Sequence, residues 1–200
     1  MERRNCLKCG ADLGESFRWA RMVNCDHCGT AHILRDAVFT LAGSSGVLHE
    51  TPGLVHMLQP FVTPKGTFDP VGMVRFSYGR GAWDEFWALD EAGSGAWISV
   101  DEGDIVLQRP TSDKDLPHFP PALGSTIGHD SEDWTVTEAE TARCIGFRGQ
   151  LPEAFELDEV FTFVNASCGD GRLLSGEFHA GAATWFIGPW LDSFELGRPG

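Results

Sequence analysis

The stretch that decides the fold is VGMVRFSYGRGAWDEFWALDEAGSGAWISV, residues 71–100. It holds three short runs rich in β-branched and aromatic residues, at 71–78, 83–89 and 95–100, and such runs favour strands. Glycine-containing segments at 79–81 and 91–94 separate the runs and are typical of hairpin turns. The stretch therefore predicts an antiparallel meander.

The same pattern extends along most of the chain. Further strands are expected at 105–108, 125–129, 134–138, 142–149, 159–165, 172–178 and 184–187. Residues 110–124 contain four prolines and form a break that neither a helix nor a central strand accepts. Apart from short helical turns expected at 152–157 and near 189–194, no helical period is sustained. We expect a mainly β fold over residues 54–200, an antiparallel β-sandwich or partly open β-barrel, with two similar β subdomains as an option.

Two Cys-x-x-Cys pairs, Cys6/Cys9 and Cys25/Cys28, lie close together at the start of the chain. This spacing predicts a four-thiolate Zn²⁺ ribbon over residues 1–36, and four sulfurs fill every position of a tetrahedral structural site. His27 and His32 are alternative ligands that four available thiols make unnecessary. So small a unit needs the metal to fold, and the Gly/Ser-containing residues 37–53 are expected to link it to the β domain.

The remaining two cysteines, Cys144 and Cys168, are expected to be inert structural thiols, because no histidine-rich neighbourhood supports a catalytic cysteine. Reduced zinc thiolates, and an N-terminus that leaves no room for a signal peptide before the first pair, favour a cytoplasmic protein. No apolar run approaches the length of a transmembrane helix.

Charge is unevenly distributed along the chain. The formal net charge is −14, with +1 in residues 1–36 and −15 in residues 37–200. Nucleic acids bind proteins mainly through neutralisation of phosphates by Lys and Arg. The acidic β domain therefore disfavours a nucleic-acid partner.

The motifs WDEFW (83–87), GAWI (95–98) and DEG (101–103) together resemble the signature of a bacterial family known as domain of unknown function 4178. The later motifs VTE (136–138), GQLP (149–152), SGE (175–177) and FIG (186–188) fit the same family, and the likeness covers about residues 54–196. Gln150 stands where the family more often has an acid. The resemblance implies a fused zinc ribbon, and an accessory role in bacterial gene clusters with membrane-stress coat proteins and polyamine-synthesis-like enzymes.

Two groups of residues are candidates for binding. The aromatic residues Trp83, Phe86, Trp87 and Trp97, with Asp84 and Glu85 between them, form either an interaction patch or part of the core. The stretch from Asp84 to Asp104 holds seven acids and no Lys or Arg, so it could attract a polyamine, a divalent cation or a basic partner surface. Solvated hairpin turns are the alternative explanation.

The nearest approach to a catalytic set is Glu138, Glu177 and His179, because a Glu–His pair two residues apart on a strand shares one face. Glu140 is a further acid beside this set. No phosphate-binding loop, nucleophile elbow or His-Glu-x-x-His motif is present, which weakens the case for an enzyme.

We therefore expect a non-enzymatic accessory protein, in which the β domain binds a protein partner and associates with membranes only through that partner. The alternative is a small-molecule or polyamine-binding domain with hydrolytic activity built around Glu138, Glu177 and His179. The sequence leaves the oligomeric state open.

Overall fold

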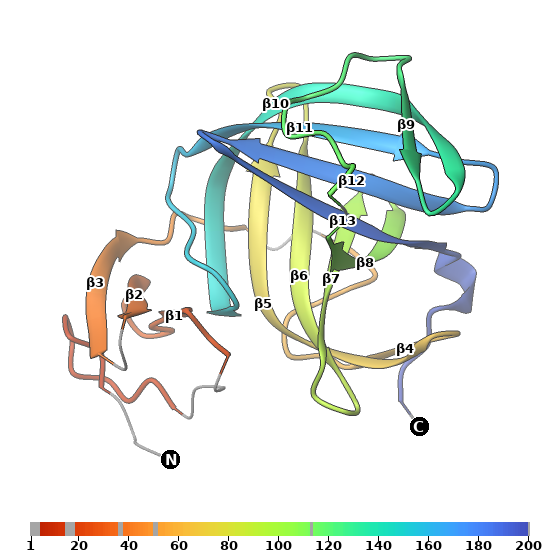
Figure 1. The fold of residues 1–200 in the computed structure, drawn as a ribbon. Coiled ribbons are helices and arrows are strands. Elements are labelled where there is room, and N and C mark those ends of the chain that lie inside the picture. The colour runs from red at the N-terminus through yellow and green to blue at the C-terminus, as the bar shows by residue number, and fades with distance from the viewer. Residues whose placement is uncertain (1–4, 15–18, 36–37, 50–51, 113, 200) are drawn as a thin grey trace.

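A computed structural model describes residues 5–14, 19–35, 38–49, 52–112 and 114–199. Within these ranges the chain forms thirteen strands joined in one antiparallel sheet system (Figure 1). The strands are β1 (Met22–Asn24), β2 (Thr30–Arg35), β3 (Val38–Ser44), β4 (Phe61–Thr63), β5 (Gly66–Ser77), β6 (Ala82–Asp90), β7 (Gly95–Asp101), β8 (Asp104–Thr111), β9 (Thr126–His129), β10 (Glu132–Leu151), β11 (Val160–Ser167), β12 (Arg172–His179) and β13 (Ala182–Leu191).

Eight of these strands close into a ring. β5 to β8 form one four-stranded meander and β10 to β13 form a second. The first strands of the two meanders pair with each other, β5 with β10, and so do the last, β8 with β13. The expected mainly β, barrel-like domain is confirmed, and its two strand blocks are the two halves of one ring.

Aromatic side chains meet across the lumen of this ring. Trp83 on β6 and Phe163 on β11 belong to strands that are not neighbours, yet their ring centroids lie 5.0 Å apart. Phe76 on β5 similarly contacts Phe161 on β11 at 5.1 Å. Because side chains alternate between the two faces of a strand, Glu85 shares the inward face with Trp83, whereas Phe86 points outward.

The outward faces of both meanders are covered by the connecting segments. Phe86, Ile98 and Leu107 of the first meander pack with Leu48 and Val55 from the stretch before β4. On the second meander, the proline-rich break brings Leu116 against the outer faces of β11 to β13. The indole Nε1 of Trp185 donates a hydrogen bond to the carbonyl of Pro117 at 2.9 Å and holds this segment in place. Much of the apolar core therefore lies outside the ring.

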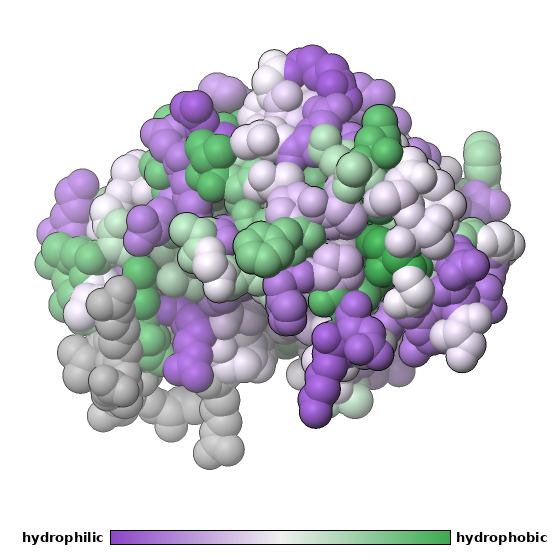
Figure 2. All heavy atoms as spheres, turned by 45° about the horizontal axis from the view of Figure 1, so that its top comes forward, coloured by the Kyte–Doolittle hydropathy of each residue, from purple (hydrophilic) through white to green (hydrophobic). Residues whose placement is uncertain are grey.

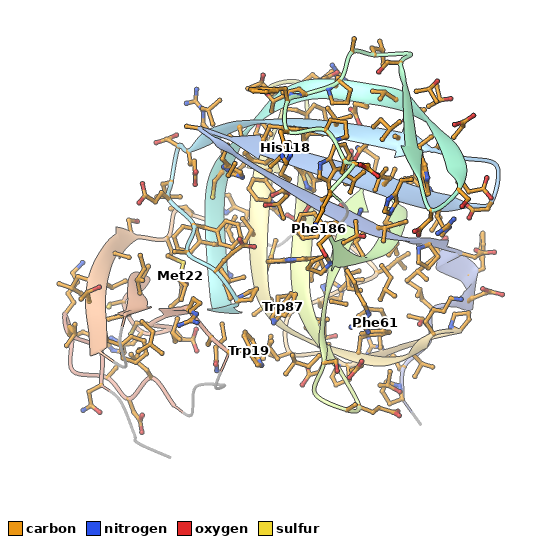
Figure 3. The ribbon with its side chains drawn as sticks, viewed as in Figure 1. Trp19, Met22, Phe61, Trp87, His118 and Phe186 are labelled. Carbon is orange, nitrogen blue, oxygen red and sulfur yellow. The ribbon has the colours of Figure 1, made fainter. Side chains whose placement is uncertain are left out.

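The cysteine-bearing N-terminal unit is attached to the side of the ring (Figure 1). Its β1 pairs with the end of β10, with Met22 opposite Leu151. Trp19 makes an edge contact with Trp87 of β6, with centroids 5.7 Å apart, and the two side chains lie next to each other in Figure 3. β3 lies inside the stretch expected to be a linker and pairs with β2. The unit is thus joined to the ring by backbone hydrogen bonds as well as by side chains.

Some local predictions differ from the structure. The helical turn expected at 152–157 is wrong, since these residues form bends and turns; near the C-terminus there is one short 3₁₀ turn at Ser193–Glu195. The two strands expected at 134–138 and 142–149 are parts of the single long β10, which pairs in turn with β9, β11, β5 and β1. Among the described residues, no helix is long and apolar enough to cross a membrane.

Candidate functional site

A cavity of about 230 Å³ opens into the lumen of the ring. Its most unusual feature is its charge: six carboxylates line it, and no Lys or Arg is among its lining residues. Aromatic side chains of Tyr78, Trp83, Phe163 and Trp190 supply the apolar part of the wall. The six acids are Glu85, Asp101, Glu102, Asp104, Glu138 and Glu177.

The tight turn between β7 and β8 places three of these acids at the cavity. Asp101 and Asp104 are paired across the turn, and the two residues between them, Glu102 and Gly103, have φ angles of 48° and 103°. A two-residue hairpin turn with positive φ at both positions matches the twist of antiparallel strands. A glutamate is uncommon in this conformation, and such positions are often found at functional sites.

A chain of hydrogen bonds crosses the cavity wall from β8 to β10. The amide of Gln108 donates to Oγ of Ser175 at 2.8 Å, and that hydroxyl donates to Oδ1 of Asn165 at 2.9 Å. The Asn165 amide in turn donates to Oε2 of Glu138 at 2.9 Å. Arg80, which is not a lining residue, pairs with Glu140 at 2.6 Å and lies 4.0 Å from Glu138. The neutral side chains of Gln108, Ser175 and Asn165 orient each other but add no positive charge to the lumen.

Two carboxylates in the cavity lack an adequate counter-charge. Burial, together with the nearby charge of Glu177, raises the pKa of Glu85 to about 8, although Glu85 accepts a hydrogen bond from Nε1 of Trp83 at 3.0 Å. Burial, followed by the charge of Glu102, also raises the pKa of Asp101. The Oδ1 atom of Asp101 is buried and has no hydrogen-bond partner among the described residues. Groups in this state favour a cationic ligand.

The expected Glu–His set is only partly assembled. Nε2 of His179 lies 3.7 Å from Glu177, and its Nδ1 lies 3.1 Å from Glu159. The imidazole is stacked on Phe161 with centroids 4.9 Å apart. The carboxylate of Glu177, and then that of Glu159, raise the pKa of His179, whereas burial lowers it; the net shift is upward. Glu138 and Glu177 line the same cavity, but His179 does not. His179 therefore contacts Glu177 from outside the cavity.

The residues of the WDEFW motif are placed in three different environments. Trp83 and Phe86, and with them Trp97 of β7, are at most 8% exposed and lie in the core. Asp84 forms a two-point ion pair with Arg75, with Oδ1 2.6 Å from Nε and Oδ2 2.8 Å from Nη2. Trp87 is partly buried and its ring lies between those of Trp19 and Trp97. Glu85 lines the cavity, and so does the buried ring of Trp83.

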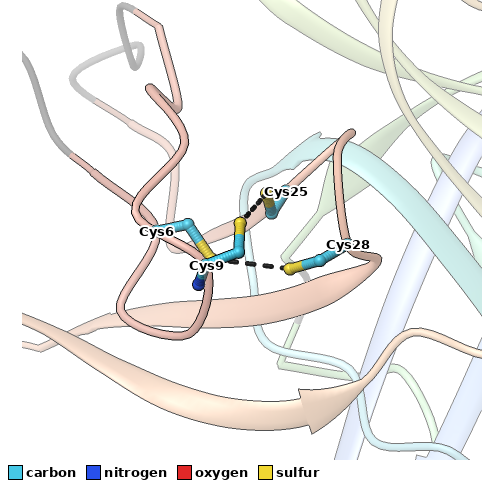
Figure 4. A group of neighbouring side chains, drawn as sticks. All are labelled: Cys6, Cys9, Cys25 and Cys28. Carbon is cyan, nitrogen blue, oxygen red and sulfur yellow. Dashed lines mark hydrogen bonds between the residues drawn. The ribbon is translucent and has the colours of Figure 1, made fainter.

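The four N-terminal cysteines come together as the sequence predicts (Figure 4). All four sulfurs lie within 4.8 Å of one another, and the Cys6–Cys28 and Cys9–Cys25 sulfur pairs are 3.6 Å apart. A tetrahedral Zn²⁺ with bonds of about 2.3 Å requires sulfurs about 3.8 Å apart, so the donor set fits this ion. A hydrogen bond with the Thr30 hydroxyl lowers the pKa of Cys28 to about 6, whereas desolvation and the neighbouring thiols raise the pKa of Cys9.

The acids of the lumen are arranged differently from this metal site. Among the described residues, the cysteine cluster is the one group of three or more His, Cys, Asp or Glu side chains with ligand atoms this close together. The carboxylates are therefore spread along the cavity, and a small metal ion would not contact three of them at once. This arrangement suits an elongated cation with several N–H donors.

Sequence reasoning missed the polar residues Gln108, Asn165 and Ser175. Each follows a buried apolar residue on its strand: Gln108 follows Leu107, Asn165 follows Val164 and Ser175 follows Leu174. The alternation of polar and apolar residues along these strands indicates that the polar side chains share one face of the sheet. Whether that face encloses a cavity depends on pairing between distant strands, which the alternation does not specify.

Comparison with known proteins places the chain in a family. No curated protein and no solved structure matches it. The family described as "Domain of unknown function (DUF4178)" matches residues 66–193, which span all eight strands of the ring and every carboxylate of the cavity. The chain therefore belongs to the DUF4178 family.

Proposed function

We propose that this protein is a binding protein for small organic cations, with linear polyamines as the leading ligand class, and that the site is the acidic cavity of the ring. The observation that carries the proposal is the set of six carboxylates around about 230 Å³ without a Lys or Arg in the wall. Ammonium groups would pair with the acids, and the methylene segments of the ligand would contact Trp83, Phe163 and Trp190.

Binding without catalysis is the better-supported activity. Hydrolysis around Glu138, Glu177 and His179 would need a nucleophile or activated water within reach of an acid–base pair. His179 does not line the cavity, and Glu138 is held by Asn165. The acids therefore serve as counter-charges for a bound cation in this proposal.

A protein-interaction module is the other candidate function, and it keeps Trp83, Asp84, Glu85, Phe86, Trp87 and Trp97 as its predicted surface. The burial of three of these aromatic residues leaves little of that surface exposed. On the face drawn in Figure 2, hydrophobic residues are scattered in small groups among hydrophilic ones. A partner attracted to the acidic rim would need a basic surface.

In this proposal the N-terminal unit, residues 1–36, binds one structural Zn²⁺ through Cys6, Cys9, Cys25 and Cys28 and acts as a folding clamp. The fit of the four sulfurs supports zinc. Residues 37–53 connect it to the acidic domain at 54–200. A bacterial origin, a cytoplasmic location and membrane association through a partner remain predictions from the sequence.

The test is isothermal titration calorimetry of the full zinc-loaded chain with butylamine, putrescine and spermidine at low and moderate salt. Affinity is expected to rise with the number of ammonium groups and to fall with salt. Glu177→Gln removes a lumen counter-charge and is expected to weaken spermidine binding about tenfold, or about 1.4 kcal/mol. Glu132→Gln, at an exposed position outside the cavity, is the matched control. No binding at millimolar amine, or equal losses in both variants, would refute the proposal.

A further inference from the structure

We propose that Glu85 holds a proton in the unliganded lumen, where it shares the cavity with Glu177, and releases it when a cation binds, so that ligand affinity depends on pH. This inference rests on the proposed function, because it concerns the same cavity. It adds a regulatory property, which follows from how the two carboxyl groups are surrounded.

The two groups face one cavity from different sides of the ring. Glu85 projects from β6 and Glu177 from β12, and both line the same space. The charge of Glu177 acts directly on Glu85. Two carboxylates that share a desolvated space without a cation between them cannot both ionise at low cost.

The partners of the two groups are unequal, and this favours a proton on Glu85. Glu177 has the His179 ring 3.7 Å away, and His179 is also held by Glu159 at 3.1 Å. This imidazole provides a counter-charge for Glu177 when it is protonated. Within the part of the chain that the structure describes, Glu85 has only the neutral indole N–H of Trp83 as its hydrogen-bond donor. The proton therefore resides on Glu85.

One further acid acts on Glu85. Glu153, in the segment after β10, contributes a like charge, and desolvation followed by the charge of Glu177 raises its own pKa to about 7. Glu153 therefore also carries part of a proton near pH 7, although it does not line the cavity. Removing it provides a control for proton release that does not come from the lumen.

The proton balance of binding is simple. When an ammonium or guanidinium group enters, the O–H bond of the Glu85 carboxyl breaks, its proton passes to the buffer, and the carboxylate pairs with the ligand. Glu85 is protonated in about nine-tenths of the molecules at pH 7, given its pKa of about 8. Linkage then predicts release of about 0.9 proton per ligand at pH 7 and an affinity that rises up to about tenfold per pH unit below pH 8.

The experiment is calorimetry of the full zinc-loaded chain with 1,4-diguanidinobutane, a probe that remains doubly charged throughout the pH range used. Titrations at pH 7 in buffers of different ionisation enthalpy give the number of protons released. We expect about 0.9 for the natural chain, a value near zero for Glu85→Gln, and a value close to 0.9 for Glu153→Gln. The Glu85→Gln protein should also bind with a nearly pH-independent affinity.

The possible outcomes separate the two proposals. Binding of the probe without proton release by the natural chain would overturn this inference and leave the proposed function standing. Release that persists in Glu85→Gln would also overturn it, since the proton would come from another group. Failure of every amine and guanidine to bind would refute the proposed function itself. If Glu85→Gln does not fold, the pH dependence of the natural chain between pH 6 and 9 still decides, because a flat profile contradicts the inference.

Discussion

Closure of the ring can be tested at a single glycine. Gly188 lies on β13 at the seam with β8, and a Cβ added there would be 1.7 Å from the carbonyl oxygen of Leu107. Backbone atoms cannot rotate away as a side chain can, so Gly188→Ala must push the two strands apart. Overpacking costs about 1–3 kcal/mol, and a clash with backbone belongs at the upper end of that range. For a chain of this size, about 3 kcal/mol corresponds to a melting temperature lower by about 6–12 °C.

The assay is thermal unfolding of the zinc-saturated chain, followed by far-ultraviolet circular dichroism. The matched control is Gly128→Ala on β9, where an added Cβ meets nothing within 4 Å. That variant should change the free energy of unfolding by less than about 1 kcal/mol, with a tendency to stabilise. Equal melting temperatures for Gly188→Ala and the natural chain would refute the reasoning, because the described β8–β13 seam leaves no room for the methyl group.

Three further outcomes follow from the site. Cys25→Ser should abolish the stoichiometric zinc measured by atomic emission, whereas Cys168→Ser, outside the sulfur cluster, should retain it; zinc retained by Cys25→Ser would contradict the four-thiolate site. Glu85 has a pKa of about 8 in the folded chain against 4.5 for the free group, so the folded state binds more protons between these values and stability falls as pH rises through this window. Glu85→Gln should remove about 4 kcal/mol of that fall, measured by urea titrations at pH 5 and pH 9, and parallel pH profiles for both proteins would argue against a buried proton. Asn165→Leu leaves Ser175 and Glu138 without their shared partner and should lower the free energy of unfolding by about 1–3 kcal/mol, which chemical denaturation would detect.

Strand positions were predictable from the sequence because they depend on local residue choice. The runs around Trp83 and Trp97 carry the aromatic and β-branched residues that fit a pleated sheet, and glycines mark their turns. The cysteine cluster was equally accessible, since metal ligation demands a spacing that the sequence displays directly.

Ring closure and the cavity were not predictable in the same way. The pairings of β5 with β10 and of β8 with β13 join residues far apart in the chain, and no local pattern specifies them. The acids near Asp101 looked like ordinary solvated turn residues, and only ring closure brings them opposite Glu138 and Glu177. The contact of His179 with Glu159 is non-local for the same reason.

The position of the apolar core explains why the lumen can be acidic. In a small closed ring, the simplest stable filling of the lumen is a set of interlocking apolar side chains. Here Leu48 and Val55 cover one meander on the outside and Leu116 covers the other, so part of the hydrophobic stabilisation comes from outside the ring. The lumen is thereby free to hold carboxylates.

Those carboxylates oppose folding. Desolvation destabilises Glu85 and Asp101 in their charged forms, and the neutral Gln108–Ser175–Asn165 chain orients the wall without compensating their charge. Natural proteins keep destabilising polar groups of this kind mainly where function requires them. A cation that pairs with these acids would remove the penalty on binding, and the same interaction would provide the affinity. The feature that costs the fold stability is therefore the feature best suited to recognise a positively charged ligand.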